Sequence, residues 1–224
     1  MERLKKAVGY QAAEIVENHM VIGLGTGSTV LYFIKALSER VKKGLNISCV
    51  SSSIKSERLA IEGGIPIANL EKITLIDLMV DGADEITTRK EMIKGGGGAL
   101  LREKVLATIS NEMVVIVDES KVVSLLGKHP LPIEVLPFAT QGVIKEIHQL
   151  GYQGTLRQTQ SGALFVTDNG NYIFDIHFDT LRKNPQKDHE KLSNIPGILE
   201  TGFFFNLAGR VMIGRANGVV EKWD

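Results

Sequence analysis

The sequence contains one cysteine, Cys49, among its 224 residues. A single cysteine can form neither an intramolecular disulfide nor a cysteine-rich zinc site, so an apolar core must stabilise the fold. Chains that do without disulfides are typical of reducing compartments, and we expect the protein to be cytoplasmic. The five histidines show no metal-ligand spacing, so no metal site is expected.

Neither sign of charge is in excess, because 26 Lys and Arg residues balance 26 Asp and Glu residues. A dedicated nucleic-acid-binding protein usually carries a basic excess, so this class is not favoured. No apolar run approaches the ~18 residues that a bilayer span requires. The polar N-terminal segment also lacks the apolar stretch of a secretory signal. We therefore expect neither nucleic acid nor a membrane as a partner.

Glycine is the one residue type in excess, at 23 of 224 residues, about 10% against an average of about 7%. Much of this excess falls in two clusters, Gly23 to Gly27 and Gly95 to Gly98. Glycine lets the backbone approach a ligand closely, so the two clusters are candidate ligand-binding loops.

The first 125 residues alternate between helical patterns and short apolar strands. Helices are predicted at 3–18, 28–43, 53–62 and 99–109, and strands at 20–24, 47–50, 65–67, 75–80 and 113–117. Strands that are apolar throughout and alternate with helices are typical of a parallel sheet covered on both faces. The prediction for this part of the chain is an α/β fold.

The pattern changes near Pro130. Strands are predicted at 131–137, 154–160, 172–178 and 198–205, and helices at 140–150 and 185–194. The resulting order β-α-β-β-α-β is that of a small ferredoxin-like α+β unit. Segments 210–214 and 218–221 are expected to return as strands to the first sheet. We predict one domain from residues 1–129 and 206–224, and a smaller one from residues 130–205.

The first glycine cluster, Gly23-Leu24-Gly25-Thr26-Gly27-Ser28-Thr29, joins a predicted strand to a predicted helix. N–H groups at a helix start can bind an anion, and Ser28 and Thr29 add hydroxyl groups. No lysine precedes Ser28 as in a P-loop, and the third glycine is displaced from the dinucleotide-binding spacing. We interpret the loop as a site for a compact phosphate. The alternative is a plain turn in which Ser28 caps the helix.

The second motif, Val80-Asp81-Gly82-Ala83-Asp84-Glu85-Ile86, follows a predicted buried strand. Open α/β sheets bind their ligands at the carboxyl ends of their strands. Two carboxylates three residues apart in a tight turn can share protons or pair with a lysine. The alternative is an Asx-turn followed by a helix cap.

The third motif begins at Lys94 and continues through the four glycines into a predicted helix. Four successive glycines lower stability through backbone entropy, which argues against a mere linker, and their N–H groups can form an anion-binding nest. The core stripe of the helix is expected at residues 101, 105, 108 and 109. Glu103 lies about 200° from Leu101 and can face a site, or simply solvent. The helix N-terminus favours its ionised form.

Taken in order, GLGTGST, VDGADEI and KGGGGALLREK resemble type A ribose-5-phosphate isomerase, and so do LPIEVLP and VTDNGN. The resemblance covers essentially the whole chain. It implies a Rossmann-like sheet carrying an α+β lid domain, a homodimer or homotetramer, and no cofactor or metal. It also implies interconversion of D-ribose 5-phosphate and D-ribulose 5-phosphate in the non-oxidative pentose phosphate pathway. One departure is Asn206-Leu207-Ala208-Gly209-Arg210, where many relatives carry Ala-Asp.

The resemblance makes Glu103 the catalytic base and Asp81, Asp84 and Lys94 the other catalytic groups. It implies substrate contacts at Thr26, Gly27, Ser28, Thr29, Asp81, Gly82, Ala83, Asp84, Lys94, Gly95, Gly96, Gly97, Lys121 and Lys5. Moving a proton between C1 and C2 through an enediolate needs a carboxylate and donors for the charged oxygen. The division of roles between the two aspartates stays open. Lys121 and Lys5 are the weakest candidates, since either alone is typical of a solvated surface.

Three rival functions fit the residues less well. A sugar-phosphate deaminase would be expected to place a ring-opening histidine in the site loops, and no histidine lies near these motifs. A CoA transferase uses a glutamate nucleophile, so Glu103 alone does not exclude it, whereas a thioester assay would. A non-catalytic sugar-phosphate sensor would need a DNA-binding module, for which we find no spare segment.

Overall fold

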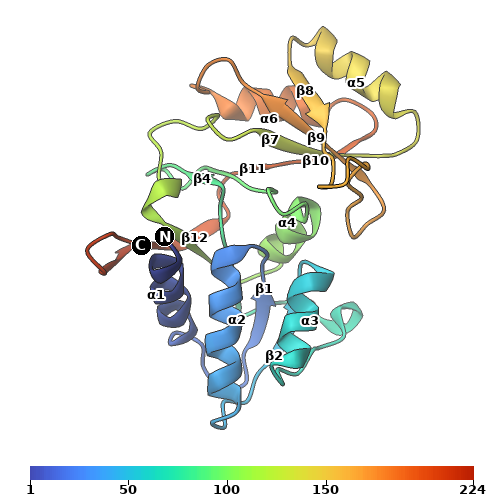
Figure 1. Cartoon of the computed structure of the whole chain (residues 1–224). Helices are drawn as coiled ribbons and strands as arrows, with labels where there is room; N and C mark the ends of the chain where they lie inside the picture. The colour runs from blue at the N-terminus through green and yellow to red at the C-terminus, as the bar shows by residue number, and fades with distance from the viewer. The chain divides into compact units, whose positions relative to one another are not determined.

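The computed structural model describes all 224 residues, and contacts divide the chain into two compact units. The first unit comprises Met1–Ala83, Arg102–Val122 and Asn206–Asp224, and the second comprises Asp84–Leu101 and Val123–Phe205. Residues 84–101 and 123–129 therefore group with the second unit and not, as the sequence suggested, with the first. Figure 1 follows the chain through both units. Their assignment as catalytic and lid domains stays a prediction.

The first unit is built on a six-stranded sheet in the order β13-β12-β6-β3-β1-β2. In that order the strands are Val220–Trp223, Ala208–Gly214, Met113–Asp118, Leu78–Asp81, Val21–Leu24 and Ser48–Ser51. All neighbours pair in parallel except β13, which pairs antiparallel with β12 at the edge. The predicted return of the C-terminal segments to this sheet is confirmed, as is the α/β class.

Helices lie on both faces of this sheet because of the chain path. α2 (Ser28–Val41) connects β1 to β2, while α4 (Leu100–Thr108) lies between β3 and β6 on the opposite side of β1. Crossovers between parallel strands are right-handed, so connections that run in opposite directions along the sheet place their helices on opposite faces. Large buried side chains fill the core, among them Ile22, Leu24, Phe33, Leu37, Val80, Val114 and Ile116.

Several predicted boundaries in this unit were wrong. α1 (Glu2–Ala13) ends five residues before the predicted end, and α3 spans Ile54–Glu62. The predicted strand at 65–67 is reduced to one bridge, between Cys49 and Ile67. β3 begins at Leu78 and not at residue 75, because the side chain of Asp77 accepts the Val21 N–H at 2.7 Å in place of a ladder hydrogen bond.

The second unit contains a four-stranded antiparallel sheet in the order β10-β7-β9-β8. These strands span Ile198–Thr201, Leu131–Val135, Tyr172–His177 and Gln153–Leu156. α5 (Thr140–Gln149) and α6 (Pro185–Ser193) complete the predicted β-α-β-β-α-β order, so the ferredoxin-like unit is confirmed. Its core gathers apolar side chains that include Ile133, Ile147, Phe174, Ile176 and Leu192. None of the helices is long and apolar enough to cross a membrane.

A small three-stranded sheet in the second unit was not predicted. It contains β11 (Phe203–Phe204), β5 (Met92–Ile93) and β4 (Glu85–Ile86) in that order. The predicted strand 198–205 is therefore two strands in different sheets, which separate at Gly202. That glycine donates its N–H to Pro132 at 2.7 Å and accepts the Lys94 N–H at 2.8 Å. Strands of two residues show no periodicity, so the sequence could not indicate them.

Candidate active site

Asp81, the last residue of β3, lies directly against the first glycine loop. It is fully buried, and its Oδ1 accepts hydrogen bonds from the backbone N–H of Thr26 at 3.0 Å and of Gly82 at 2.7 Å. A Cβ on Gly25 would overlap the Asp81 carboxyl group. Glycine is therefore required at position 25 so that the loop can lie on the carboxylate.

The N-terminus of α2 carries a lysine. Gly27 is the N-cap, with φ at 120°, and Ser28 is the first helical residue, so the alternative in which Ser28 caps the helix was wrong. A glycine cap offers no side-chain acceptor to the first N–H groups, which have no partner within a helix. Lys5 Nζ donates to Ser28 Oγ at 2.9 Å, and Thr29 follows in the first turn. A cation, two hydroxyl groups and a helix N-terminus together suit an anion.

Serines after β2 hold the same loop, and the sequence reasoning missed them. Ser52 Oγ lies 2.9 Å from Thr26 Oγ1, and Ser56 Oγ donates to the Gly25 carbonyl at 2.7 Å. Ser53 caps α3 by accepting the Ser56 N–H at 3.2 Å. The available signal was the run Ser51-Ser52-Ser53, which directly follows the strand predicted at 47–50.

Lys121 belongs to a short 3-10 helix, η2 (Glu119–Lys121), directly after β6. Because β6, β3 and β1 are parallel, their carboxyl ends share one edge of the sheet. No hydrogen bond or ion pair joins Lys121 to the Thr26–Thr29 loop. The structure thus places Lys121 at the expected edge, and its substrate contact stays a prediction.

Glu103 occupies the buried face of α4, and the predicted core stripe of this helix was wrong. Val105 is 50% exposed, whereas Glu103 is only 3% exposed. The buried residues are Leu100, Glu103, Leu106 and Ala107, whose spacing of three and four places them on one helix face. Burying a carboxylate is costly, so a glutamate on the buried face of a helix indicates a function. Its place in the first turn favours the ionised form.

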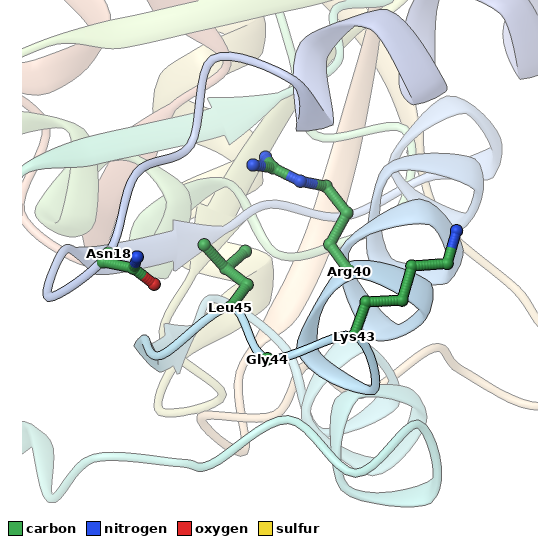
Figure 2. A pocket seen from close by; sticks show the side chains of 5 residues that line it. All are labelled: Asn18, Arg40, Lys43, Gly44 and Leu45. Atoms are coloured by element: carbon green, nitrogen blue, oxygen red, sulfur yellow. The ribbon is translucent and has the colours of Figure 1, made fainter.

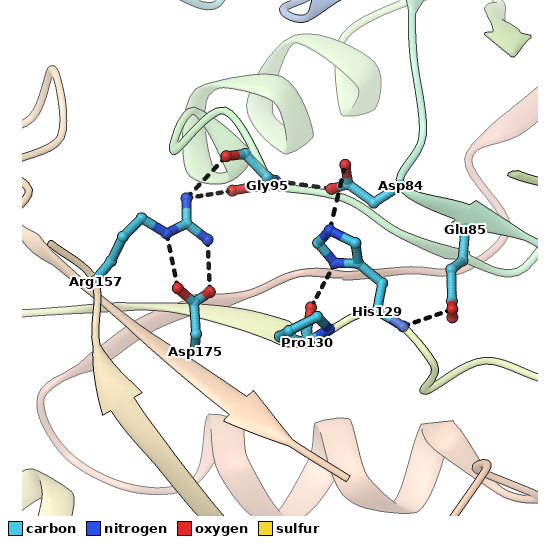
Figure 3. A network of polar contacts seen from close by, with 8 residues as sticks. Asp84, Glu85, Gly95, His129, Pro130, Arg157 and Asp175 are labelled. Atoms are coloured by element: carbon cyan, nitrogen blue, oxygen red, sulfur yellow. Dashed lines mark hydrogen bonds and ion pairs between the residues drawn. The ribbon is translucent and has the colours of Figure 1, made fainter. Parts of the chain in front are cut away.

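Asp84 lies in the second unit, where it holds the second glycine loop (Figure 3). Its Oδ2 accepts the Gly96 N–H at 2.7 Å, and a Cβ on Gly96 would lie 2.6 Å from its Oδ1. The Nε2 atom of His129 lies 4.0 Å from Asp84 Oδ1. No histidine is near these motifs in the sequence, but the fold brings His129 to Asp84. The sequence could not show this contact, because the two residues are 45 positions apart along the chain.

Lys94 precedes this loop and is 2% exposed, with Nζ 5.3 Å from the centroid of the Phe204 ring. Its position depends on the small sheet, since its N–H bonds to Gly202 next to β11. Within the loop, Gly98 donates to the Gly95 carbonyl at 2.9 Å, and the Gly96 N–H is held by Asp84. Two of the four N–H groups expected to form an anion nest are thus already engaged.

No group of three or more His, Cys, Asp or Glu side chains could hold a metal ion. A hollow of about 330 Å³ in the first unit is lined by Asn18, Arg40, Lys43, Gly44 and Leu45 (Figure 2). It lies at the amino ends of β1 and β2, the sheet edge opposite to the predicted site. Arg40 donates to the carbonyls of Ala13 and Val16, which assigns it to packing after α1.

Comparisons with known proteins agree over the length of the chain. Residues 48–218 match the family described as ribose 5-phosphate isomerase A (phosphoriboisomerase A). Ribose-5-phosphate isomerase A of Protochlamydia amoebophila is 51% identical over 219 residues, 98% of this chain and 94% of the relative. The solved ribose 5-phosphate isomerase of Plasmodium falciparum is 36% identical, with a TM-score of 0.96 over 100% of this chain and 99% of its own. A D-ribose-5-phosphate isomerase solved with phospho-erythronic acid is 40% identical, with a TM-score of 0.94 over 100% and 98% of the two chains.

Proposed function

The chain belongs to the ribose-5-phosphate isomerase A family, and from this premise we propose how its residues catalyse the reaction. The activity expected from the sequence, interconversion of D-ribose 5-phosphate and D-ribulose 5-phosphate, is confirmed by the family. It is an aldose–ketose isomerisation in which a proton moves between C1 and C2. Such a transfer needs one carboxylate at the carbons and donors for the oxygen that gains charge.

Glu103 is the catalytic base in this proposal. The observation that carries it is the burial of this carboxylate, at 3% exposure, in the first turn of α4. The helix N-terminus favours the ionised form of a carboxylate there, and burial shields it from water, as suits a base for a carbon-bound proton. It removes the proton from one carbon and returns it to the other through an enediolate.

The phosphate group binds at the N-terminus of α2. Lys5, Ser28 and Thr29 supply charge and hydroxyl groups, and the Thr26–Gly27 backbone completes the loop. Lys121 adds a second cation from the same sheet edge. The hydrogen bond between Lys5 and Ser28 supports this assignment most directly, because it brings a cation to an uncapped helix N-terminus.

The two aspartates act on different parts of the reaction. The carboxylate of Asp81, whose Oδ1 accepts the backbone N–H groups of Thr26 and Gly82, moves the hydroxyl proton during ring opening and isomerisation. Gly82 and Ala83 contact the sugar beside Asp81.

Asp84 orients the second glycine loop. Lys94 and the N–H groups of Gly95 and Gly97 stabilise the oxyanion.

We further propose that the protein is a cytoplasmic homodimer or homotetramer that works without a cofactor. The single cysteine supports a reducing compartment, and the absence of a metal-ligand cluster supports a metal-free reaction. The ligand is a small sugar phosphate, and phospho-erythronic acid in a solved relative is a molecule of this class.

The assignment of the base is tested by Glu103→Gln, which keeps the size of the side chain and removes its basicity. We expect turnover to fall by at least roughly 10²–10⁴-fold, together with exchange of the substrate C2 proton in D₂O. Glu57→Gln, in the first turn of α3 but exposed, is the matched control. Proton exchange near the parent rate in Glu103→Gln would transfer the role to another carboxylate. Loss of substrate binding would instead make Glu103 a positioning group.

A further inference from the structure

Within the second unit, Arg157 contacts both the glycine loop and Asp175, with which it forms an ion pair (Figure 3). Its Nη1 donates to the carbonyls of Gly95 at 2.9 Å and Gly96 at 3.1 Å. Its Nε and Nη2 donate to the two carboxylate oxygens of Asp175 at 2.8 and 2.5 Å. The arginine and aspartate side chains are only 15% and 18% exposed, so water screens the pair weakly.

The contacts of Arg157 and Asp84 meet on one peptide group. The peptide bond between Gly95 and Gly96 presents its C=O to Arg157 and its N–H to Asp84. In a trans peptide these two groups point in opposite directions, so both ends of the same plane are held. A run of glycines has little intrinsic preference for one peptide orientation, and therefore these two side chains select it.

The next peptide bond carries the consequence for the reaction. It joins the Gly96 carbonyl, which Arg157 also holds, to the N–H of Gly97. With its C=O directed at the guanidinium, this peptide must direct the Gly97 N–H away from Arg157. The far end of the loop is restrained too, because the Phe165 ring lies so close to Gly98 that an added Cβ would overlap it. Cζ of Arg157 lies 5.7 Å from the centroid of the same ring.

We infer that Arg157 is a positioning residue that, by holding the Gly95 and Gly96 carbonyls, aims the Gly97 N–H at the oxyanion of the reaction. The inference rests on the proposed role of Gly95 and Gly97 as substrate contacts. Asp175 keeps the guanidinium in the plane that both carbonyls require. A lysine cannot replace Arg157, because an ammonium group lacks the planar fork that binds a carboxylate and two carbonyls at once.

A second ion pair of the same unit provides the matched control. Arg182 donates to Asp188 through Nε at 2.8 Å and Nη2 at 2.7 Å, the same fork geometry as in the Arg157 pair. Cζ of Arg182 lies 4.7 Å from the centroid of the Phe178 ring. Its side chain donates to no carbonyl of the glycine loop. Arg182→Ala thus removes an equivalent ion pair without releasing the loop.

The test compares Arg157→Ala, Arg157→Lys and Asp175→Asn with Arg182→Ala in the isomerisation of ribose 5-phosphate. We expect kcat to fall roughly tenfold to a hundredfold in both Arg157 variants, and to fall less in Asp175→Asn. The KM should stay within about twofold of the parent value, because an oxyanion donor acts mainly in the transition state. Added ethylguanidinium should restore part of kcat in Arg157→Ala and none in Arg182→Ala. Thermal unfolding of the variants separates this effect from lost stability, and Arg157→Lys provides a milder change should Arg157→Ala fold poorly.

A kcat in Arg157→Lys equal to that of Arg182→Ala would overturn the inference, as would a loss that appears only in KM. Glu103→Gln measured in the same assay separates the two proposals. If Glu103→Gln is inactive while Arg157→Lys is fully active, the role of Arg157 is refuted and the assignment of Glu103 as the base is kept. An active Glu103→Gln refutes the assignment of the base, whatever the Arg157 variants do.

Discussion

The backbone N–H of Thr26 donates a hydrogen bond to Oδ1 of Asp81 at 3.0 Å, which joins the loop after β1 to the end of the neighbouring strand β3. The proposed phosphate loop and the proposed proton-transfer group thus form one rigid piece. Because the same carboxylate shapes the loop and takes part in the proposed chemistry, a change in the loop should alter both binding and turnover.

Gly25→Ala should damage this piece directly. The new Cβ would overlap the Asp81 carboxyl group, so loop and carboxylate must separate. We expect kcat/KM to fall at least roughly tenfold and the free energy of unfolding to fall by about 1–3 kcal/mol, as for other overpacked sites. Gly142→Ala in α5, where an added Cβ meets no atom within 4 Å, is the control and should not lose stability. Parent-like kinetics of Gly25→Ala would show that the contact between loop and carboxylate is not needed.

Lys5→Ala should weaken substrate binding. Lys5 Nζ reaches Ser28 at the N-terminus of α2, whereas the next residue, Lys6, lies with its Nζ 5.4 Å from the centroid of the Tyr10 ring. We expect the KM for ribose 5-phosphate to rise roughly tenfold in Lys5→Ala and to stay unchanged in Lys6→Ala, which removes the same charge. Lys121→Ala and Thr29→Ala belong in the same series. An unchanged KM in any of these three variants removes that residue from the phosphate site.

Exhaustive treatment with EDTA should leave activity intact. No cluster of side chains in the chain has the composition of a metal site, and the proposed chemistry uses carboxylates and N–H donors only. The measurement is kcat before and after dialysis against the chelator, with a known metalloenzyme as a positive control. Loss of activity that Mg²⁺ or Zn²⁺ restores would contradict the proposed mechanism.

Stability should decrease at alkaline pH because of Cys49. The thiol is buried in β2, and desolvation raises its pKa to about 12, whereas an unfolded thiol titrates near pH 8.5. The unfolded chain therefore loses this proton first, so the stabilising contribution is fully present below about pH 8.5 and is lost as pH rises toward 12. Urea unfolding of the parent at pH 8 and pH 10 should show this loss, and Cys49→Ala should show a smaller one. Equal pH dependence of the two proteins would assign the effect to other groups.

Features that depend on neighbouring residues could be predicted from the sequence. Apolar strands alternating with helices predicted the parallel sheet, and the element order after Pro130 predicted the ferredoxin-like unit. Three motifs in order predicted the family. The helices and strands show in short stretches of sequence, because side chains on one face recur with a short period. Each motif likewise lies within a few consecutive residues. The roles of the individual site residues stay predictions.

Contacts between residues far apart along the chain could be found only in the folded structure. The pairs Lys5–Ser28, Thr26–Asp81 and Arg157–Gly95 are 23, 55 and 62 residues apart along the chain. The buried face of α4 also depended on packing, which selected Glu103 where the pattern favoured Val105. The sheet that holds Lys94 is made of two-residue strands, too short for any periodicity. Such contacts follow from the closing of long loops by the whole fold, and no local pattern records them.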